Sequence, residues 1–204
     1  MVGFYNYTVY MTYLGFVSGV TGIIFSFDGK SLSAVICLLI SGVCDLFDGK
    51  IARTKKDRTD EERRFGIQID SLSDLVCFGV LPGCIGLSLG RTGLFQYIIT
   101  AFFVLAGLIR LAYFNVTEET RQQNETGNRK YYLGVPITSS ALIMPIVYFM
   151  CRAAGNHAAL IYGISLLVLG FLFIAPLKIK KPGKTGTIVL ICTGAAVLAL
   201  MLLF

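Results

Sequence analysis

Long apolar runs of about twenty residues alternate along the chain with short polar connections. About 20 apolar residues in a helix are needed to cross the hydrocarbon core of a bilayer. We therefore predict seven membrane spans, at residues 7–27, 31–52, 68–89, 94–115, 134–152, 157–176 and 186–204. No internal repeat is evident, and no connection is longer than the segment 116–133. The pattern predicts an all-α polytopic membrane protein in which residues 1–204 form one membrane domain.

The composition agrees with this class. Of the 204 residues, 55% are hydrophobic and 15% are charged, whereas soluble domains have roughly 45–50% apolar and about 25% charged residues. The mean hydropathy is +0.72. The N-terminal stretch MVGFYNYTVYMTYLGF has no basic region and no small-residue cleavage site. We therefore expect a retained first helix and not a signal peptide.

Basic residues lie mainly in alternate connections. The connections after the second, fourth and sixth spans hold thirteen of them: Arg53, Lys55, Lys56, Arg58, Arg63, Arg64, Arg121, Arg129, Lys130, Lys178, Lys180, Lys181 and Lys184. The opposite connections hold only Lys30, Arg91 and Arg152. The positive-inside rule then predicts a cytoplasmic N-terminus and three cytoplasmic basic loops. Because this topology accounts for the net charge of +6, we expect no nucleic-acid partner.

Four aspartates flank the first basic loop inside apolar runs. Asp45 and Asp48 end the second span, and Asp70 and Asp74 open the third. Their spacings of three and four residues place each pair on one helix face. At 1.5 Å rise per residue, Asp45 and Asp74 lie roughly 12–15 Å from the cytoplasmic helix ends. Since carboxylates at membrane depth are costly and mark functional sites, we expect two antiparallel helices to bring the four together.

Such a cluster needs a counter-charge, because four neighbouring carboxylates do not all ionise without one. Protonation, basic side chains or divalent cations could serve. Lys50 points off the aspartate face, and Arg110 in the fourth span is a single charge. Hard oxygen ligands suit Mg²⁺, Mn²⁺ or Ca²⁺, and two such ions can clamp the oxygens of a phosphoryl displacement. Gly49 and Gly66 share the aspartate faces, which suits either ligand approach or close helix packing.

The stretch from Asp45 to Asp74 resembles the signature of the CDP-alcohol phosphotransferase family, D-x-x-D-G-x-x-A-R followed by G-x-x-x-D-x-x-x-D. All eight fixed positions are present: Asp45, Asp48, Gly49, Ala52, Arg53, Gly66, Asp70 and Asp74. The gap of twelve residues between Arg53 and Gly66 is longer than in many members. It falls in the charged loop, where insertions are tolerated.

Further stretches are similar to one branch of that family, the small bacterial and archaeal phosphatidylserine synthases. They are FGIQIDSLSDLVCFGVLPG, IRLAYFNV (109–116) and YYLGVPITSSALIMP (131–145). The resemblance covers most of residues 7–150. The first span, YMTYLGFVSG, matches the opening helix of the family only loosely, because the usual Asn ahead of the Thr is not evident.

The resemblance implies a six-helix core, usually homodimeric, with a divalent-metal site open to the cytoplasm. It implies transfer of the phosphatidyl group from CDP-diacylglycerol to the hydroxyl of L-serine, which releases CMP and forms phosphatidylserine. Carried over by position, the four aspartates hold Mg²⁺ or Mn²⁺, two ions in all, and Asp74 is also the general base. Gly49, Ala52, Arg53 and Gly66 would shape the nucleotide pocket. We expect an integral protein of a bacterial or archaeal cytoplasmic membrane.

Two alternatives remain from the sequence. An ion-coupled transporter also needs intramembrane carboxylates, but it needs polar groups along the full depth, and the outer halves of these spans are apolar. A related enzyme could use glycerol phosphate, inositol phosphate or choline as the acceptor. Arg110 fits the single carboxylate of serine, so we predict that it binds the acceptor. It could instead be a structural partner of Asp70, Asp74 or a backbone carbonyl.

Overall fold

The computed structural model describes residues 3–52, 54–90, 93–124, 131–152 and 155–180, together with 193, 194, 196 and 199. Helices make up most of these residues, which confirms the expected all-α class. In chain order the elements are η1 (Tyr7–Val9), α1 (Tyr10–Phe27), α2 (Ser31–Ala52), α3 (Asp60–Asp74), η2 (Leu75–Val80), α4 (Leu81–Ser88), α5 (Leu94–Asn124), β1 (Tyr131–Leu133), η3 (Ile137–Ser139), α6 (Ser140–Arg152), η4 (Gly155–His157), α7 (Ala158–Ile174) and β2 (Lys178–Lys180).

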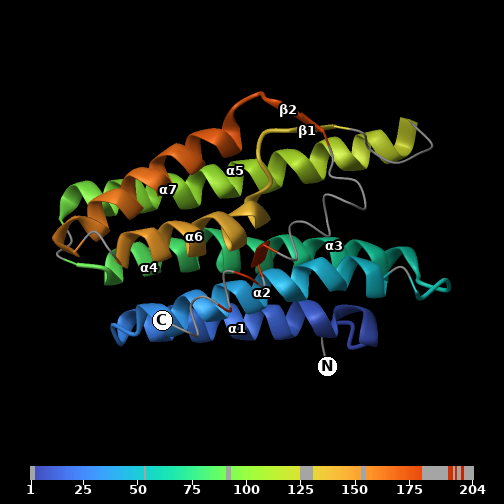
Figure 1. Cartoon of the computed structure of the whole chain (residues 1–204). Coiled ribbons are helices and arrows are strands. Elements are labelled where there is room, and N and C mark those ends of the chain that lie inside the picture. Colours follow the sequence, from blue (N-terminus) through green and yellow to red (C-terminus); the bar gives the residue numbers. More distant parts are fainter. Residues whose placement is uncertain are drawn as a thin grey trace.

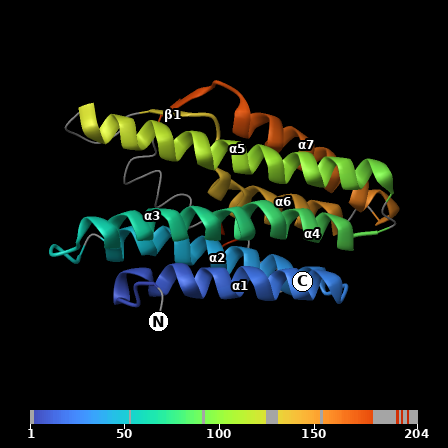
Figure 2. The same cartoon turned by 180° about the vertical axis from the view of Figure 1, so that it is seen from behind.

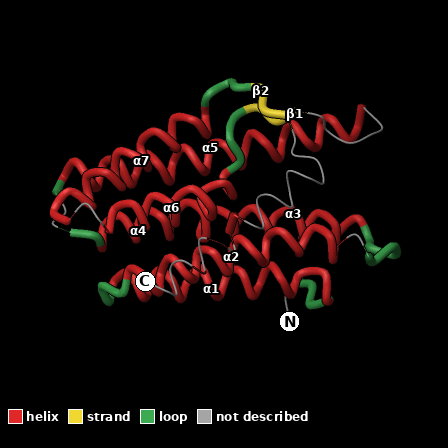
Figure 3. The backbone as a smooth tube through the Cα atoms, in the orientation of Figure 1, coloured by secondary structure: helices red, strands yellow, loops and turns green. Residues whose placement is uncertain are grey.

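The helices form an elongated bundle. Figure 1 shows α1 and α2 along one side and α5 and α7 along the other, with α3, α4 and α6 between them, and the view from behind in Figure 2 keeps this order. The two short strands pair antiparallel beside the second half of α5 (Figure 3). The aspartate-bearing helices α2 and α3 both pack against α1.

Most of the predicted spans are confirmed. Four helical segments are long and apolar enough to cross a membrane: Tyr7–Phe27, Ser31–Ala52, Asp60–Ser88 and Leu94–Arg121. Two further apolar helices, Ile137–Arg152 and Ala158–Ile174, are shorter. They coincide with the fifth and sixth predicted spans, and the seventh, 186–204, falls almost entirely outside the described residues. These apolar helices indicate that the chain is an integral membrane protein.

The third helix begins eight residues before its predicted start at 68. Thr59 and Glu62 form a capping box, in which each side chain accepts a hydrogen bond from the backbone N–H of the other residue. This box satisfies two of the free N–H groups at the helix start. Arg63 therefore lies on the helix, paired with Asp60 one turn earlier at 3.8 Å. The hydropathy pattern missed this turn because its residues are charged and lie beyond the apolar run.

A helix of π type follows Asp74 directly. Residues Leu75–Val80 form η2, and α4 continues the same rod with Pro82 in its first turn. Proline has no N–H, so it leaves the carbonyl of a preceding turn without its helical donor. The Ser140 hydroxyl of α6 donates to the carbonyl of Phe78 at 2.8 Å. A π segment widens the helix locally and is common beside functional sites, and here it separates the turn of Asp74 from the outer half of the rod.

Small residues let α1 pack tightly against α2 and η2. A Cβ added at Gly15 would lie 3.1 Å from the Cβ of Cys44, and one at Gly19 would lie 2.5 Å from the sulfur of Cys77. The Gly15 carbonyl also accepts hydrogen bonds from Ser41 at 2.9 Å and from Cys77 at 3.4 Å. Close backbone approach at small residues is a general way of packing helices in membranes. It holds α1 within side-chain reach of the aspartates.

Candidate active site

The four aspartates converge on one pocket. Asp45 and Asp48 come from α2, and Asp70 and Asp74 come from α3. All four line a single small pocket, to which α1 contributes Thr12. Carboxylate oxygens of Asp45, Asp70 and Asp74 lie within 4.8 Å of one another. The convergence expected from the helix faces is confirmed, whereas the role of each carboxylate stays a prediction.

Asp48 accepts a hydrogen bond from α1. It is buried, with 9% of its surface exposed, and its Oδ2 accepts a hydrogen bond of 3.3 Å from the Thr12 hydroxyl. Thr12 is not among the site residues predicted from the sequence. The first span has several hydroxyl residues, and a helical hydroxyl usually bonds to its own backbone, as Thr21 does with the Val17 carbonyl at 2.8 Å. Only the packing of α1 on α2 distinguishes Thr12.

The donor set of the pocket fits a divalent cation. The described residues that line it include no lysine, arginine or histidine, and no salt bridge joins the four carboxylates to any described residue. Ca²⁺ and Mg²⁺ take oxygen ligands at about 2.0–2.6 Å, so oxygens within 4.8 Å of one another can share one ion. Lys50, expected to point off this face, lies over the Phe47 ring at 5.4 Å.

The other signature positions lie near the cytoplasmic end predicted for these helices. A Cβ at Gly49 would meet nothing within 4 Å, so the backbone there faces open space. A Cβ at Gly66 would lie 2.5 Å from an Nη atom of Arg58. The Ala52 carbonyl accepts a hydrogen bond of 3.5 Å from the same guanidinium. Arg53 lies outside the described residues.

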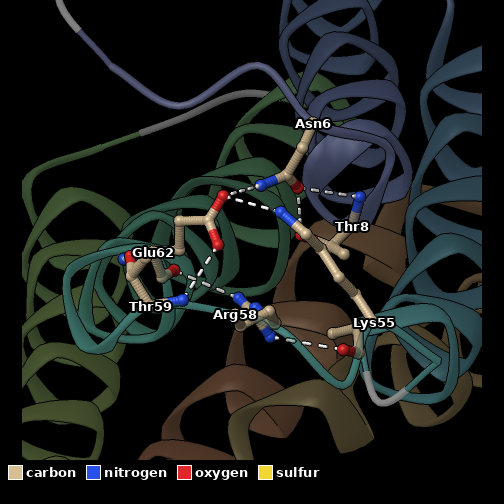
Figure 4. Close-up of polar contacts among 7 residues, drawn as sticks. Asn6, Thr8, Lys55, Arg58, Thr59 and Glu62 are labelled. Atoms are coloured by element: carbon tan, nitrogen blue, oxygen red, sulfur yellow. Dashed lines mark hydrogen bonds and ion pairs between the residues drawn. The ribbon is translucent and has the colours of Figure 1, made fainter.

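The loop between α2 and α3 is fastened to the N-terminal segment (Figure 4). Glu62 accepts hydrogen bonds from the Asn6 amide at 2.9 Å and from the Lys55 ammonium at 2.8 Å. The bond to Glu62 raises the pKa of Lys55 above its usual value. Asn6 also caps η1, because its side-chain oxygen accepts from the Thr8 N–H at 3.1 Å. This network fixes the loop across the ends of α1, α2 and α3.

Arg110 does not line the aspartate pocket. Its side chain is 6% exposed, and its Nε donates to the Val135 carbonyl at 3.3 Å. The guanidinium also lies 5.2 Å from the centre of the Phe114 ring. A structural bond of Arg110 to a backbone carbonyl was one of the alternatives left open by the sequence, and the bond to Val135 is of this type. The role of Arg110 in binding the acceptor stays a prediction. About one and a half turns further along α5, Asn115 donates to Ser71 on α3 at 2.8 Å.

A comparison with protein families agrees with this site. The family model described as CDP-alcohol phosphatidyltransferase matches residues 5–175, a range that contains all four aspartates and the six apolar helical segments. The chain belongs to the CDP-alcohol phosphatidyltransferase family. The resemblance inferred from the signature is thereby confirmed.

Individual relatives of this CDP-alcohol phosphatidyltransferase carry related names. A CDP-diacylglycerol--serine O-phosphatidyltransferase of Saccharomyces cerevisiae is 37% identical over 139 residues, which are 66% of this chain and 49% of the relative. A protein of the same name from Helicobacter pylori is 29% identical over 169 residues, 78% of this chain and 65% of the relative. Archaetidylserine synthase of Methanothermobacter thermautotrophicus is 31% identical over 172 residues, 83% of this chain and 67% of the relative. The matched part thus spans about half to two thirds of these relatives.

Proposed function

We propose that this family member transfers the phosphatidyl group of CDP-diacylglycerol to the hydroxyl of L-serine, forming phosphatidylserine and releasing CMP. The observation that carries the proposal is the convergence of Asp45, Asp48, Asp70 and Asp74 on one pocket in a CDP-alcohol phosphatidyltransferase. The names of the relatives support serine as the acceptor. The other acceptors considered from the sequence have no such support.

In the proposed reaction the serine oxygen bonds to the phosphorus that carries the diacylglycerol. The bond between that phosphorus and the bridging oxygen of CMP breaks, and CMP leaves. A serine hydroxyl is a poor nucleophile at neutral pH, so a positioned carboxylate that accepts its proton speeds the attack. We assign this base to Asp74, which lies at the inner end of the cluster, where α3 passes into η2.

The four carboxylates would hold the divalent metal, Mg²⁺ or Mn²⁺, with room in the donor set for two ions. When bound, such ions supply positive charge to the phosphate oxygens of the substrate. Asp45, Asp70 and Asp74 would share an ion through the oxygens that lie within 4.8 Å of one another. Asp48 would contribute from the side of α1, oriented by its bond to Thr12.

We assign the nucleotide end of the substrate to Gly49, Ala52, Arg53 and Gly66. The open space beside Gly49 supports this assignment, because a phosphate can approach the backbone where no side chain stands. Arg110 is our candidate for the serine carboxylate, since a guanidinium binds a carboxylate with two parallel hydrogen bonds.

We further propose that residues 1–204 form one domain that works as a homodimer in the cytoplasmic membrane. The excess of basic residues in the α2–α3 loop supports a pocket that faces the cytoplasm.

A liposome experiment separates the enzyme from the transporter. Purified protein in vesicles that contain CDP-diacylglycerol is given serine and Mn²⁺ or Mg²⁺, while CMP and ion flux are both followed. The proposed function predicts CMP release that depends on serine, without ion flux. Ion flux that needs no CDP-lipid would favour the transporter.

A further inference from the structure

Arg58 lies between the two halves of the signature, although it belongs to neither. Its guanidinium donates to the Ala52 carbonyl at the end of α2 and to the Glu62 carbonyl in α3, at 3.5 Å and 3.1 Å. In Figure 4 dashed lines mark these two hydrogen bonds on opposite sides of the guanidinium. Arg58 thus links the end of the first half of the signature to the helix that carries the second half.

The same guanidinium has an unused donor. Its Nε is buried and has no hydrogen-bond partner among the described residues, and no described carboxylate lies within ion-pair distance of the side chain. Both of its acceptors are neutral carbonyl oxygens. A buried donor without an acceptor is costly, and a cation without a counter-charge attracts an anion. The unpaired charge and the free donor make Arg58 suited to bind an anionic ligand.

Gly66 makes room for this arginine. A Cβ at position 66 would lie 2.5 Å from an Nη atom of Arg58, which is far inside van der Waals contact. Any residue larger than glycine would push the guanidinium away from its place. In this chain Gly66 therefore accommodates the Arg58 side chain.

We propose that Arg58 binds a phosphate oxygen of the CDP moiety through Nε and the adjacent Nη atoms. The inference rests on the proposed function for the identity of the substrate, and it adds a binding residue outside the signature. A guanidinium presents its donors in a planar fork that matches phosphate geometry. The backbone at Gly49, three residues before the end of α2, faces open space that a phosphate can enter.

The test measures CDP binding to the purified chain by calorimetry, and the KM values for CDP-diacylglycerol and serine. Charged hydrogen bonds contribute about 1.5–3 kcal/mol, so Arg58→Gln is expected to weaken CDP binding about ten- to hundredfold. The KM for CDP-diacylglycerol should rise similarly, with the KM for serine unchanged. The control is Arg63→Gln, because the Arg63 side chain is 61% exposed and its one ion pair among the described residues is with Asp60. It should bind CDP as the wild type does.

Gly66→Ala provides a second variant, which displaces the Arg58 guanidinium without changing Arg58 itself. It should weaken CDP binding as much as Arg58→Gln, and the double variant should be no worse than either single one, because both changes remove the same contact. Gly93→Ala is the matched control, since a Cβ at Gly93 would meet nothing within 4 Å. Fully additive losses in the double variant would overturn the proposal.

A purely structural role predicts other results. Arg58→Gln would then lower the melting temperature and impair both substrates equally, which would overturn the proposal. If Arg58→Gln does not fold, Arg58→Lys decides, because it keeps the charge but loses Nε and the planar fork. Unchanged CDP binding by Arg58→Lys would count against the proposal.

A wild type that binds CDP but transfers to no alcohol would refute the proposed function alone. Normal CDP binding by an active Arg58→Gln variant would refute only this inference.

Discussion

The Thr12 hydroxyl donates a hydrogen bond of 3.3 Å to Oδ2 of Asp48, which joins α1 to α2 inside the aspartate pocket. Asp48 is buried. The bond to Oδ2 therefore orients a carboxylate that has little contact with solvent. Residues that orient metal ligands matter nearly as much as the ligands themselves. Thr12 therefore becomes a positioning residue if Asp48 holds a cation.

Thr12→Val should raise the half-saturating concentration of Mg²⁺ or Mn²⁺. The valine keeps the shape but removes the hydrogen bond from position 12 to Asp48, and the loss of such a partner typically costs about 10–100-fold in metal affinity or activity. The measurement is CMP release as a function of metal concentration. Thr21→Val is the control, because Thr21 lies on the same helix and its hydroxyl donates to the Val17 carbonyl of its own helix, outside the pocket. An unchanged metal dependence in Thr12→Val would exclude the positioning role.

Removal of divalent cations should abolish transfer. The four carboxylates have no basic partner among the described residues, and like charges at this distance oppose one another's ionisation. Protein treated with EDTA and checked for residual metal should release no CMP, and added Mg²⁺ or Mn²⁺ should restore release. Full turnover by metal-free protein would refute the metal site.

Asp74→Asn should lower kcat while CDP-diacylglycerol still binds. The amide has nearly the same size but accepts no proton, and loss of a general base costs about 10²–10⁴-fold. CMP release gives kcat, and binding of the CDP-lipid is measured separately. Asp28→Asn is the matched control, because Asp28 is 52% exposed and pairs with Lys30 outside the pocket. Near-normal turnover of Asp74→Asn would mean that another group is the base.

Arg110→Lys should raise the KM for serine and leave the KM for CDP-diacylglycerol unchanged. Lysine keeps the charge but cannot form two parallel bonds to a carboxylate, and a selective change of one KM indicates loss of binding to that substrate. Arg110→Lys also loses the Nε bond to the Val135 carbonyl. If both substrates are impaired equally and the melting temperature falls, the arginine has the structural role instead.

The aspartate cluster could be predicted because its geometry is local. Spacings of three and four residues fix one face of each helix, and a short loop makes the two helices antiparallel neighbours. Asp45 and Asp74 are therefore brought together by chain connectivity alone. The eight signature positions also lie within a short stretch of sequence. The family could therefore be recognised from them without knowledge of the fold.

The contacts made by Thr12 and Arg58 could not be predicted in this way. The Thr12 bond joins residues 36 positions apart and depends on how closely glycines let α1 approach its neighbours. Arg58 lies in a charged loop whose sequence is typical of a solvated segment, and only the fold places its guanidinium beside Gly66. The early start of α3 was missed for a related reason, since a capping box stabilises a charged turn that has no apolar pattern.

The most direct test of the central claim identifies the lipid product. Purified protein is incubated with CDP-diacylglycerol, Mn²⁺ or Mg²⁺ and, in parallel, labelled serine, glycerol phosphate, inositol phosphate or choline, and the lipids are separated by chromatography. We expect labelled phosphatidylserine, an equal amount of CMP, and no product with the other three alcohols. Lipid product from one of those alcohols in place of serine would contradict the proposed acceptor, and the absence of CMP with all four would contradict the proposed reaction.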